Sequence, residues 1–198
     1  MKKFSLFLAV AILLSCCFVG LVGCEKEAAS GEGTSEQEAT TPAKTEVTGA
    51  LADIFAAVDN EISISEHVSD VLYKADDAED MMMLWYGVVD IPAADHLIDY
   101  VVTSPSSETY QTFALFVFDD EMTQEDYDEV REVVKETYME TRASSLQMYF
   151  PEEYAIMSWA IENQDLVWRQ YDNALALIIN GDEEATAAWD AFEEAALK

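Results

Sequence analysis

The stretch Tyr110-Gln-Thr-Phe-Ala-Leu-Phe-Val-Phe118 decides the fold. Aromatic and β-branched residues of this kind favour a β-strand. Because successive side chains of a strand point to opposite faces, the apolar residues divide into two sets: Phe113, Leu115 and Val117 on one side, and Ala114, Phe116 and Phe118 on the other. A strand that is apolar on both faces is predicted to lie in the middle of a sheet.

Two β-hairpins extend outward from this strand. Leu97 to Thr103 has a similar composition and is separated from it by Ser104-Pro105-Ser106-Ser107, which predicts a hairpin with a longer loop. Further along, Leu166 to Tyr171 and Ala174 to Ile179 form a second predicted hairpin about Asp172-Asn173. The two hairpins together predict an antiparallel sheet of about four strands.

Helical patterns fill the rest of the chain. They cover Gly49 to Asn60, Asp77 to Tyr86, a long helix after Thr123, another from Pro151 and a last one after Asp182. The long helix begins with a capping-box sequence and carries a stripe at helical spacing, made of Tyr127, Val130, Val134, Tyr138 and Thr141. We therefore predict an α+β fold in which helices pack on one face of an antiparallel sheet.

The N-terminal segment has the pattern of a secretory signal. Lys2 and Lys3 precede an almost wholly apolar run that ends at Gly23. Residues 24–46 are acidic and contain no aromatic side chain, so they are predicted to form a flexible tether with a reach of roughly 25 Å. Residues 47–198 are predicted to form a single α+β domain.

The signal ends in Leu21-Val22-Gly23-Cys24, which resembles the lipobox of bacterial lipoproteins. In that family the cysteine thiol takes a diacylglycerol, and the signal is cut just before it. The resemblance implies that Cys24 is the lipidated first residue of the mature chain, anchored on the extracytoplasmic face of the cell membrane. An ordinary secretory signal or an uncleaved anchor helix is the alternative. Cys16 and Cys17 would leave with the signal, so thiol catalysis and disulfides are not expected.

The charge of the chain limits its partners. Its 198 residues include 10 Lys and Arg against 40 Asp and Glu, a formal net charge of -30, yet 51% are hydrophobic. So few basic residues argue against binding to nucleic acid. Removal of Lys2 and Lys3 would leave 8 basic side chains against all 40 acidic ones. Because anionic headgroups repel such a surface, the lipid on Cys24 must hold the protein at the membrane.

A second resemblance concerns the domain itself. The ordered set consists of the Phe113–Phe118 strand, the long helix with Arg142 near its end, Tyr149-Phe-Pro-Glu-Glu-Tyr154 and the strand Leu175-Ala-Leu-Ile-Ile179. Residues 85–198 with this set resemble the small lipoproteins of Gram-positive bacteria that carry a domain of unknown function. The resemblance implies an envelope location and an α+β fold, and it brings no catalytic residues.

Two groups of residues are candidates for binding. Trp168 stands beside Arg169, and an arginine on a strand of so acidic a protein is either a partner or anion contact or an ion pair with a neighbouring carboxylate. Asp76, Asp77 and Asp80 offer hard oxygen ligands for a divalent cation such as calcium, although they do not match the EF-hand loop. The same acids also suit the N-terminal end of a helix. No cofactor is predicted.

The sequence leaves three functions open. The first is a non-catalytic binding or assembly module that meets a protein partner at the cell envelope. The second is an envelope hydrolase with paired carboxylates, for which Asp119-Asp120-Glu121 and Glu152-Glu153 are candidates. The third is a calcium-responsive module. His67 and His96 lie in unrelated segments and are interpreted as surface or strand-end residues rather than catalytic bases.

Overall fold

The computed structural model describes residues 46–74, 87–181 and 185–197. Within these ranges, five strands form one antiparallel sheet in the order β1-β2-β3-β5-β4. The strands are β1 (Val68–Tyr73), β2 (Leu97–Pro105), β3 (Thr112–Phe118), β4 (Trp168–Tyr171) and β5 (Ala174–Ile179). The strand β3 is the third of the five, which confirms its predicted central position.

Both predicted hairpins are present. The strands β2 and β3 pair antiparallel, and so do β4 and β5 about Asp172-Asn173. The two hairpins join through β3 and β5, where Leu115 lies opposite Ala176. The fifth strand, β1, was not predicted. It carries exposed Ser69 and Asp70 at a sheet edge, and its register shifts beside β2, so it lacks the apolar alternation that marks a buried strand.

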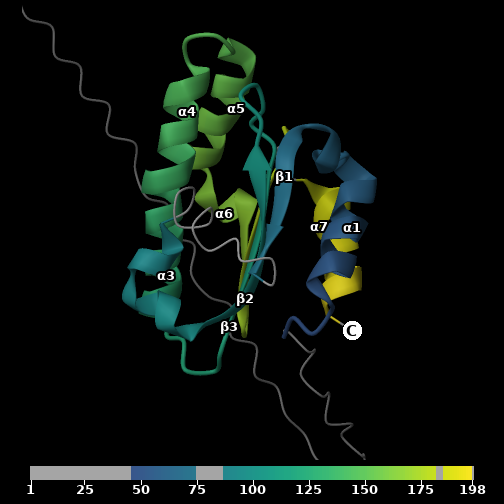
Figure 1. The fold of residues 1–198 in the computed structure, drawn as a ribbon, viewed down its shortest axis with the longest axis vertical. Coiled ribbons are helices and arrows are strands. Elements are labelled where there is room, and N and C mark those ends of the chain that lie inside the picture. The colour runs from purple at the N-terminus through teal and green to yellow at the C-terminus, as the bar shows by residue number, and fades with distance from the viewer. Residues whose placement is uncertain (1–45, 75–86, 182–184, 198) are drawn as a thin grey trace, which may run out of the picture. The chain divides into compact units, whose positions relative to one another are not determined.

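Helices cover both faces of the sheet, so the prediction that they pack on one face is wrong (Figure 1). One face contacts α3 (Gln124–Val134), α4 (Glu140–Leu146), α5 (Pro151–Glu162) and α6 (Gln164–Val167). The other face contacts α1 (Leu51–Ile62) and α7 (Thr186–Ala196). The reason is the double-sided apolar character of the central strands, because each apolar face must be covered.

The side chains of β3 divide between two cores. Ala114, Phe116 and Phe118 belong to the core under α3–α6, whereas Phe113 and Leu115 belong to the core under α1 and α7. This division is the one that strand alternation predicts. Short helical segments complete the described fold: η1 (Ile64–Glu66), η3 (Val88–Asp90), η4 (Pro92–His96) and the π-helical turn η5 (Lys135–Met139).

The helix after Thr123 begins as predicted and then changes its buried side. Thr123 and Asp126 form both bonds of the capping box. Tyr127, Val130, Val134 and Tyr138 are buried, but Thr141 is exposed, which corrects the end of the predicted stripe. The cause is η5, because a π turn holds one more residue than an α turn and rotates the following residues. As a result, Arg142 and Leu146 point inward from α4.

Several predictions fall outside the described residues. They are the signal over 1–23, nearly all of the tether over 24–46 and the helix over Asp77 to Tyr86. In the part of the chain that is described, no helix is both long and apolar enough to span a membrane.

Candidate functional site

A hollow of about 510 Å³ lies at the end of the sheet where β2 turns into β3. The connection between these strands passes between the segment before β1 and the first turn of α5 (Figure 1). We call this hollow the loop pocket. Its lining residues are Glu66, His67, Val68, Ser106, Glu108, Thr109, Tyr110, Gln111, Phe150 and Glu153.

A buried arginine holds the loop that forms this pocket. Arg142 is only 6% exposed, although arginine is a residue that rarely leaves water. Its Nε donates to the Thr109 carbonyl at 2.8 Å, and its Nη2 donates to the carbonyls of Ser106 and Thr109. Burial lowers the pKa of the guanidinium below its ordinary value, but an arginine remains charged in proteins. The fork geometry of Arg142 therefore fixes two positions of the loop at once.

The loop is also tied to both neighbouring elements. The Ser106 hydroxyl donates to the His67 carbonyl at 2.9 Å, which joins the loop to the segment before β1. The Tyr110 hydroxyl donates to the Asn180 carbonyl at 3.3 Å, after the end of β5. A Cβ atom on Gly181, where φ is +85°, would lie 2.5 Å from this hydroxyl, so glycine permits the approach. The loop pocket is thus formed by the fold itself.

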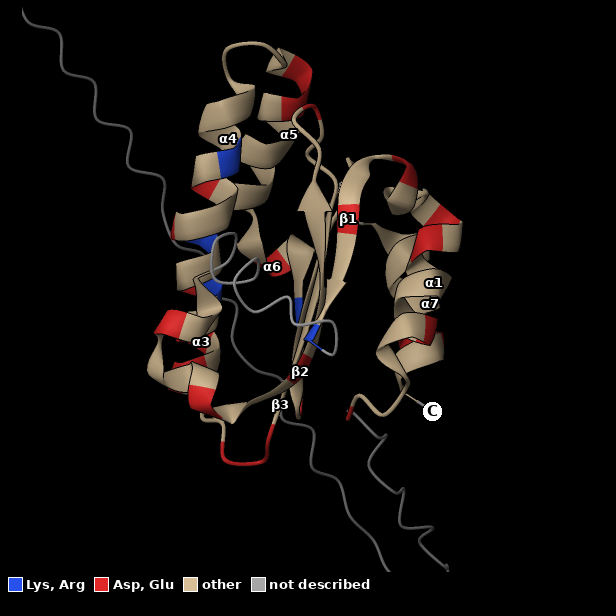
Figure 2. Ribbon diagram, viewed as in Figure 1, with Lys and Arg blue, Asp and Glu red and all other residues tan. Residues whose placement is uncertain are grey.

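The pocket is acidic and partly aromatic. Glu66, Glu108 and Glu153 line it, and no Lys or Arg belongs to its described lining. Figure 2 shows acidic residues in the β2–β3 connection and at the start of α5. Burial chiefly, with the negative charge of Glu153 in addition, raises the pKa of Tyr110 above its ordinary value, so Glu153 acts at short range on this side of the pocket.

One buried atom of the pocket wall is unsatisfied. The Oε1 atom of Gln111 is buried and has no hydrogen-bond partner among the described residues. Most buried polar atoms in folded proteins have a partner, which is either a protein group or an ordered water. This oxygen has almost no accessible surface, so it lies inside the wall and does not face the hollow.

The residues Trp168 and Arg169 are not brought together into one site. Neighbouring strand residues point to opposite faces, and β4 follows this rule. Trp168 is 3% exposed in the core under α3–α6, and its Nε1 donates to Gln164 Oε1 at 3.0 Å. Arg169 lies on the other face, 4.6 Å above the Trp189 ring and 2.5 Å from Glu193. Arg169 therefore forms an ion pair with Glu193, which is the second of the two roles that the sequence left open for it.

The remaining sequence candidates give no further site in the described residues. Cys24, Asp76, Asp77 and Asp80 lie outside those residues. Within the described ranges, no group of three or more His, Cys, Asp and Glu side chains is arranged to hold a metal ion.

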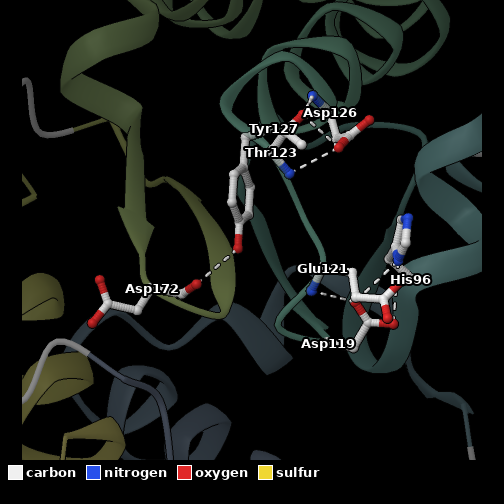
Figure 3. A network of polar contacts seen from close by, with 7 residues as sticks. All are labelled: His96, Asp119, Glu121, Thr123, Asp126, Tyr127 and Asp172. Carbon is white, nitrogen blue, oxygen red and sulfur yellow. Dashed lines mark hydrogen bonds and ion pairs between the residues drawn. The ribbon is translucent and has the colours of Figure 1, made fainter.

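His96 belongs to a polar network at the opposite end of the β2–β3 hairpin (Figure 3). Its Nδ1 lies 3.0 Å from Asp119 Oδ1, and this oxygen also accepts the Glu121 backbone N–H at 2.9 Å. The hydrogen bond with Asp119 is the main cause that raises the pKa of His96 above 6.5. The network joins the start of β2 to the turn after β3, and its contacts serve to fix that turn.

Sequence reasoning missed the loop pocket. The sequence pattern predicts Tyr110 and Gln111 as strand residues, whereas β3 begins at Thr112, and Arg142 enters only through the family resemblance. The inward position of Arg142 follows from the π turn before it, which no local residue pattern marks. Once buried, the guanidinium requires oxygen partners, and the fold provides them from the β2–β3 connection.

Comparison with known proteins gives no relative from which a role could be transferred. No protein-family profile, curated protein or solved structure matches this chain.

Proposed function

We propose that this protein is a lipid-anchored, non-catalytic binding module on the extracytoplasmic face of the cell membrane. Lipidated Cys24 would hold it there, and the loop pocket would be its binding site. The observation that carries the binding role is the attachment of the pocket loop to Arg142, His67 and Asn180 by hydrogen bonds of the chain itself. Pockets that are largely preformed and lined by a few convergent polar groups are typical of ligand sites.

The anchor is tested by comparing two cysteine variants of the full chain. Cys24→Ala should release the protein from the membrane fraction or leave an unprocessed precursor, because the thiol that takes the lipid is absent. Cys17→Ala is the matched control, since Cys17 lies within the same segment and should leave with it. Fractionation with mass spectrometry provides the readout. If Cys24→Ala keeps the mass and membrane location of the wild type, the anchor is refuted.

A hydrolase is the second candidate, and one observation supports it. Glu66, Glu108 and Glu153 border the same hollow as the aromatic rings of Tyr110 and Phe150, and glycoside hydrolysis uses paired carboxyl groups in such a setting. We expect the full chain to release no soluble sugar fragments from purified cell-wall glycan. Release that disappears in the Glu108→Gln, Glu153→Gln double variant would overturn the non-catalytic proposal.

A further inference from the structure

We infer that Asn180, followed by Gly181, is a modification site at which the asparagine loses ammonia and becomes a mixture of aspartate and isoaspartate. The reactants are this chain and water. The inference goes beyond the proposed binding role and does not depend on it. It rests on the position of the pair at the end of β5, on the backbone of Gly181 and on its contact with Tyr110.

The reaction is a ring closure between two neighbouring groups. The Gly181 backbone nitrogen loses its proton to hydroxide and attacks Cγ of Asn180. The new N–Cγ bond forms as the Cγ–Nδ2 bond breaks, and the leaving nitrogen departs as ammonia after it takes a proton from water. Water then opens the succinimide ring at Cγ, which gives aspartate, or at the former backbone carbonyl, which gives isoaspartate. Each product carries a carboxylate in place of the neutral amide.

The glycine makes this asparagine the reactive one. Asparagine is a chemically labile residue, and in this chain only Asn180 precedes a glycine. A residue without a Cβ atom lets its backbone nitrogen approach Cγ without steric hindrance. The fold requires glycine here, because φ of Gly181 is +85° and a Cβ atom would lie 2.5 Å from the Tyr110 hydroxyl oxygen. The other asparagines precede residues that have a side chain: Asn60, Asn163 and Asn173.

The pair lies just beyond the sheet. The pairing of β5 with β3 ends at Ile179, and Asn180 and Gly181 follow as a bend in which Gly181 is exposed. Ring closure requires rotation of the backbone at Asn180, which is easier outside a hydrogen-bonded ladder than within one. Asn173 is held more tightly, because its side chain bonds to both the N–H and the carbonyl of Val47.

The Tyr110 hydroxyl assists the first step. It donates to the Asn180 carbonyl at 3.3 Å, and this carbonyl belongs to the same peptide unit as the Gly181 N–H. When the nitrogen loses its proton, negative charge spreads onto the carbonyl oxygen, so a donor placed there stabilises the reactive anion. Burial chiefly, with the charge of Glu153 in addition, raises the pKa of Tyr110, so the hydroxyl keeps its proton at mildly alkaline pH.

The test follows the full-length chain in non-ionic detergent at mildly alkaline pH, in water enriched in heavy oxygen. Peptide mapping by mass spectrometry should find aspartate and isoaspartate in place of Asn180, each with a heavy oxygen atom. Asn60 is the internal control, because it is exposed but precedes Glu61, and it should react at least about tenfold more slowly. Direct hydrolysis of the amide gives aspartate alone. Equal rates at Asn60 and Asn180, or a product without isoaspartate, would overturn the inference.

Two tyrosine variants test the assistance by the hydroxyl. Tyr110→Phe should slow the reaction of Asn180 at least about threefold, because the donor to its carbonyl is absent. Tyr149→Phe is the matched control, since Tyr149 is 74% exposed, and it should keep the wild-type rate. In concentrated urea, where the fold is lost, the wild type and both variants should react equally fast. A folded Tyr110→Phe chain that reacts as fast as the wild type would refute the assistance.

Discussion

At the scale of single residues, Arg142 holds the loop that forms the loop pocket. Its guanidinium is buried and donates to the carbonyls of Ser106 and Thr109, which would otherwise lose a partner in a poorly solvated place. Leaving buried acceptors unsatisfied costs more than a hydrogen bond normally contributes. The loop pocket therefore depends on a residue that does not line it.

Replacement of Arg142 tests this dependence. We expect Arg142→Met to lower the free energy of unfolding by about 3 kcal/mol, because the two loop carbonyls lose their donor. Arg131→Met is the control, since within the described residues Arg131 forms a long hydrogen bond of 3.4 Å to Gln170, and its loss should cost about 0.5 kcal/mol or less. Urea unfolding measures both. Similar losses for the two variants would contradict the role of Arg142 in holding the loop.

His96 should make the stability of the protein depend on pH, and the shift of its pKa gives the direction. The hydrogen bond with Asp119 raises the pKa of His96 above 6.5, so folding favours its protonated form. This contribution to stability is fully present below pH 6.5 and is lost as the pH rises through the raised value. The pKa of Asp119 is lowered, chiefly by the Glu121 N–H, so the contribution of that carboxylate disappears when the pH falls through the lowered value.

We expect His96→Asn and Asp119→Asn to remove the same part of the profile. In the wild type, the free energy of unfolding should decline as the pH rises above 6.5, and each variant should flatten that decline. Chemical denaturation between about pH 5 and pH 9 provides the comparison. A decline that persists unchanged in His96→Asn would show that other groups cause it.

At the scale of elements, the prediction from sequence succeeded where the pattern is local. The central strand β3, the two hairpins and the Thr123 cap follow from residue type and spacing. The edge strand β1 has no such pattern, because one side of an edge strand is left without a neighbour. The rotation of α4 also had no local signal, since nothing in Lys135–Met139 marks a π turn.

Helices α1 and α7 together cover the second face of the sheet. The backbone just before α1 approaches the end of α7 closely at Gly49. The N–H groups of Thr48 and Gly49 donate to the Ala196 carbonyl at 2.8 and 3.1 Å. A Cβ atom on Gly49 would lie 2.3 Å from the Ala195 carbonyl oxygen, so a side chain there must push the two helices apart.

Gly49→Ala should therefore lower the free energy of unfolding by about 1–3 kcal/mol through overpacking. Ala52→Ser, at an exposed position of α1, should change it by about 0.5 kcal/mol or less. Thermal or urea unfolding of the two variants gives the measurement. A neutral Gly49→Ala would mean that the helices tolerate a wider separation than the structure indicates.

At the scale of the whole molecule, the dominant property is a formal net charge of -30. Such a charge opposes the compact state by self-repulsion and attracts cations over the whole surface. A hollow of about 690 Å³ beside α3, lined by Glu125, Asp128, Glu129 and Glu132 among others, illustrates this general attraction. Binding of a cation to this protein is informative only when the position of binding is resolved.

We expect the melting temperature to rise when NaCl is increased from about 10 to about 500 mM, because salt screens the repulsion. Calcium and magnesium chloride at equal ionic strength should then give equal shifts. A further rise with calcium alone, reversed by a chelator, would support the calcium-responsive alternative instead.

The attachment of the pocket loop to Arg142 is the central claim, and amide hydrogen exchange of the full-length chain tests it most directly. The Gln111 amide, which donates to Thr109 Oγ1 at 3.0 Å, reports on the loop. We predict that Arg142→Met speeds the exchange of this amide and that Arg131→Met leaves it unchanged. Unchanged exchange in a folded Arg142→Met variant would contradict the claim.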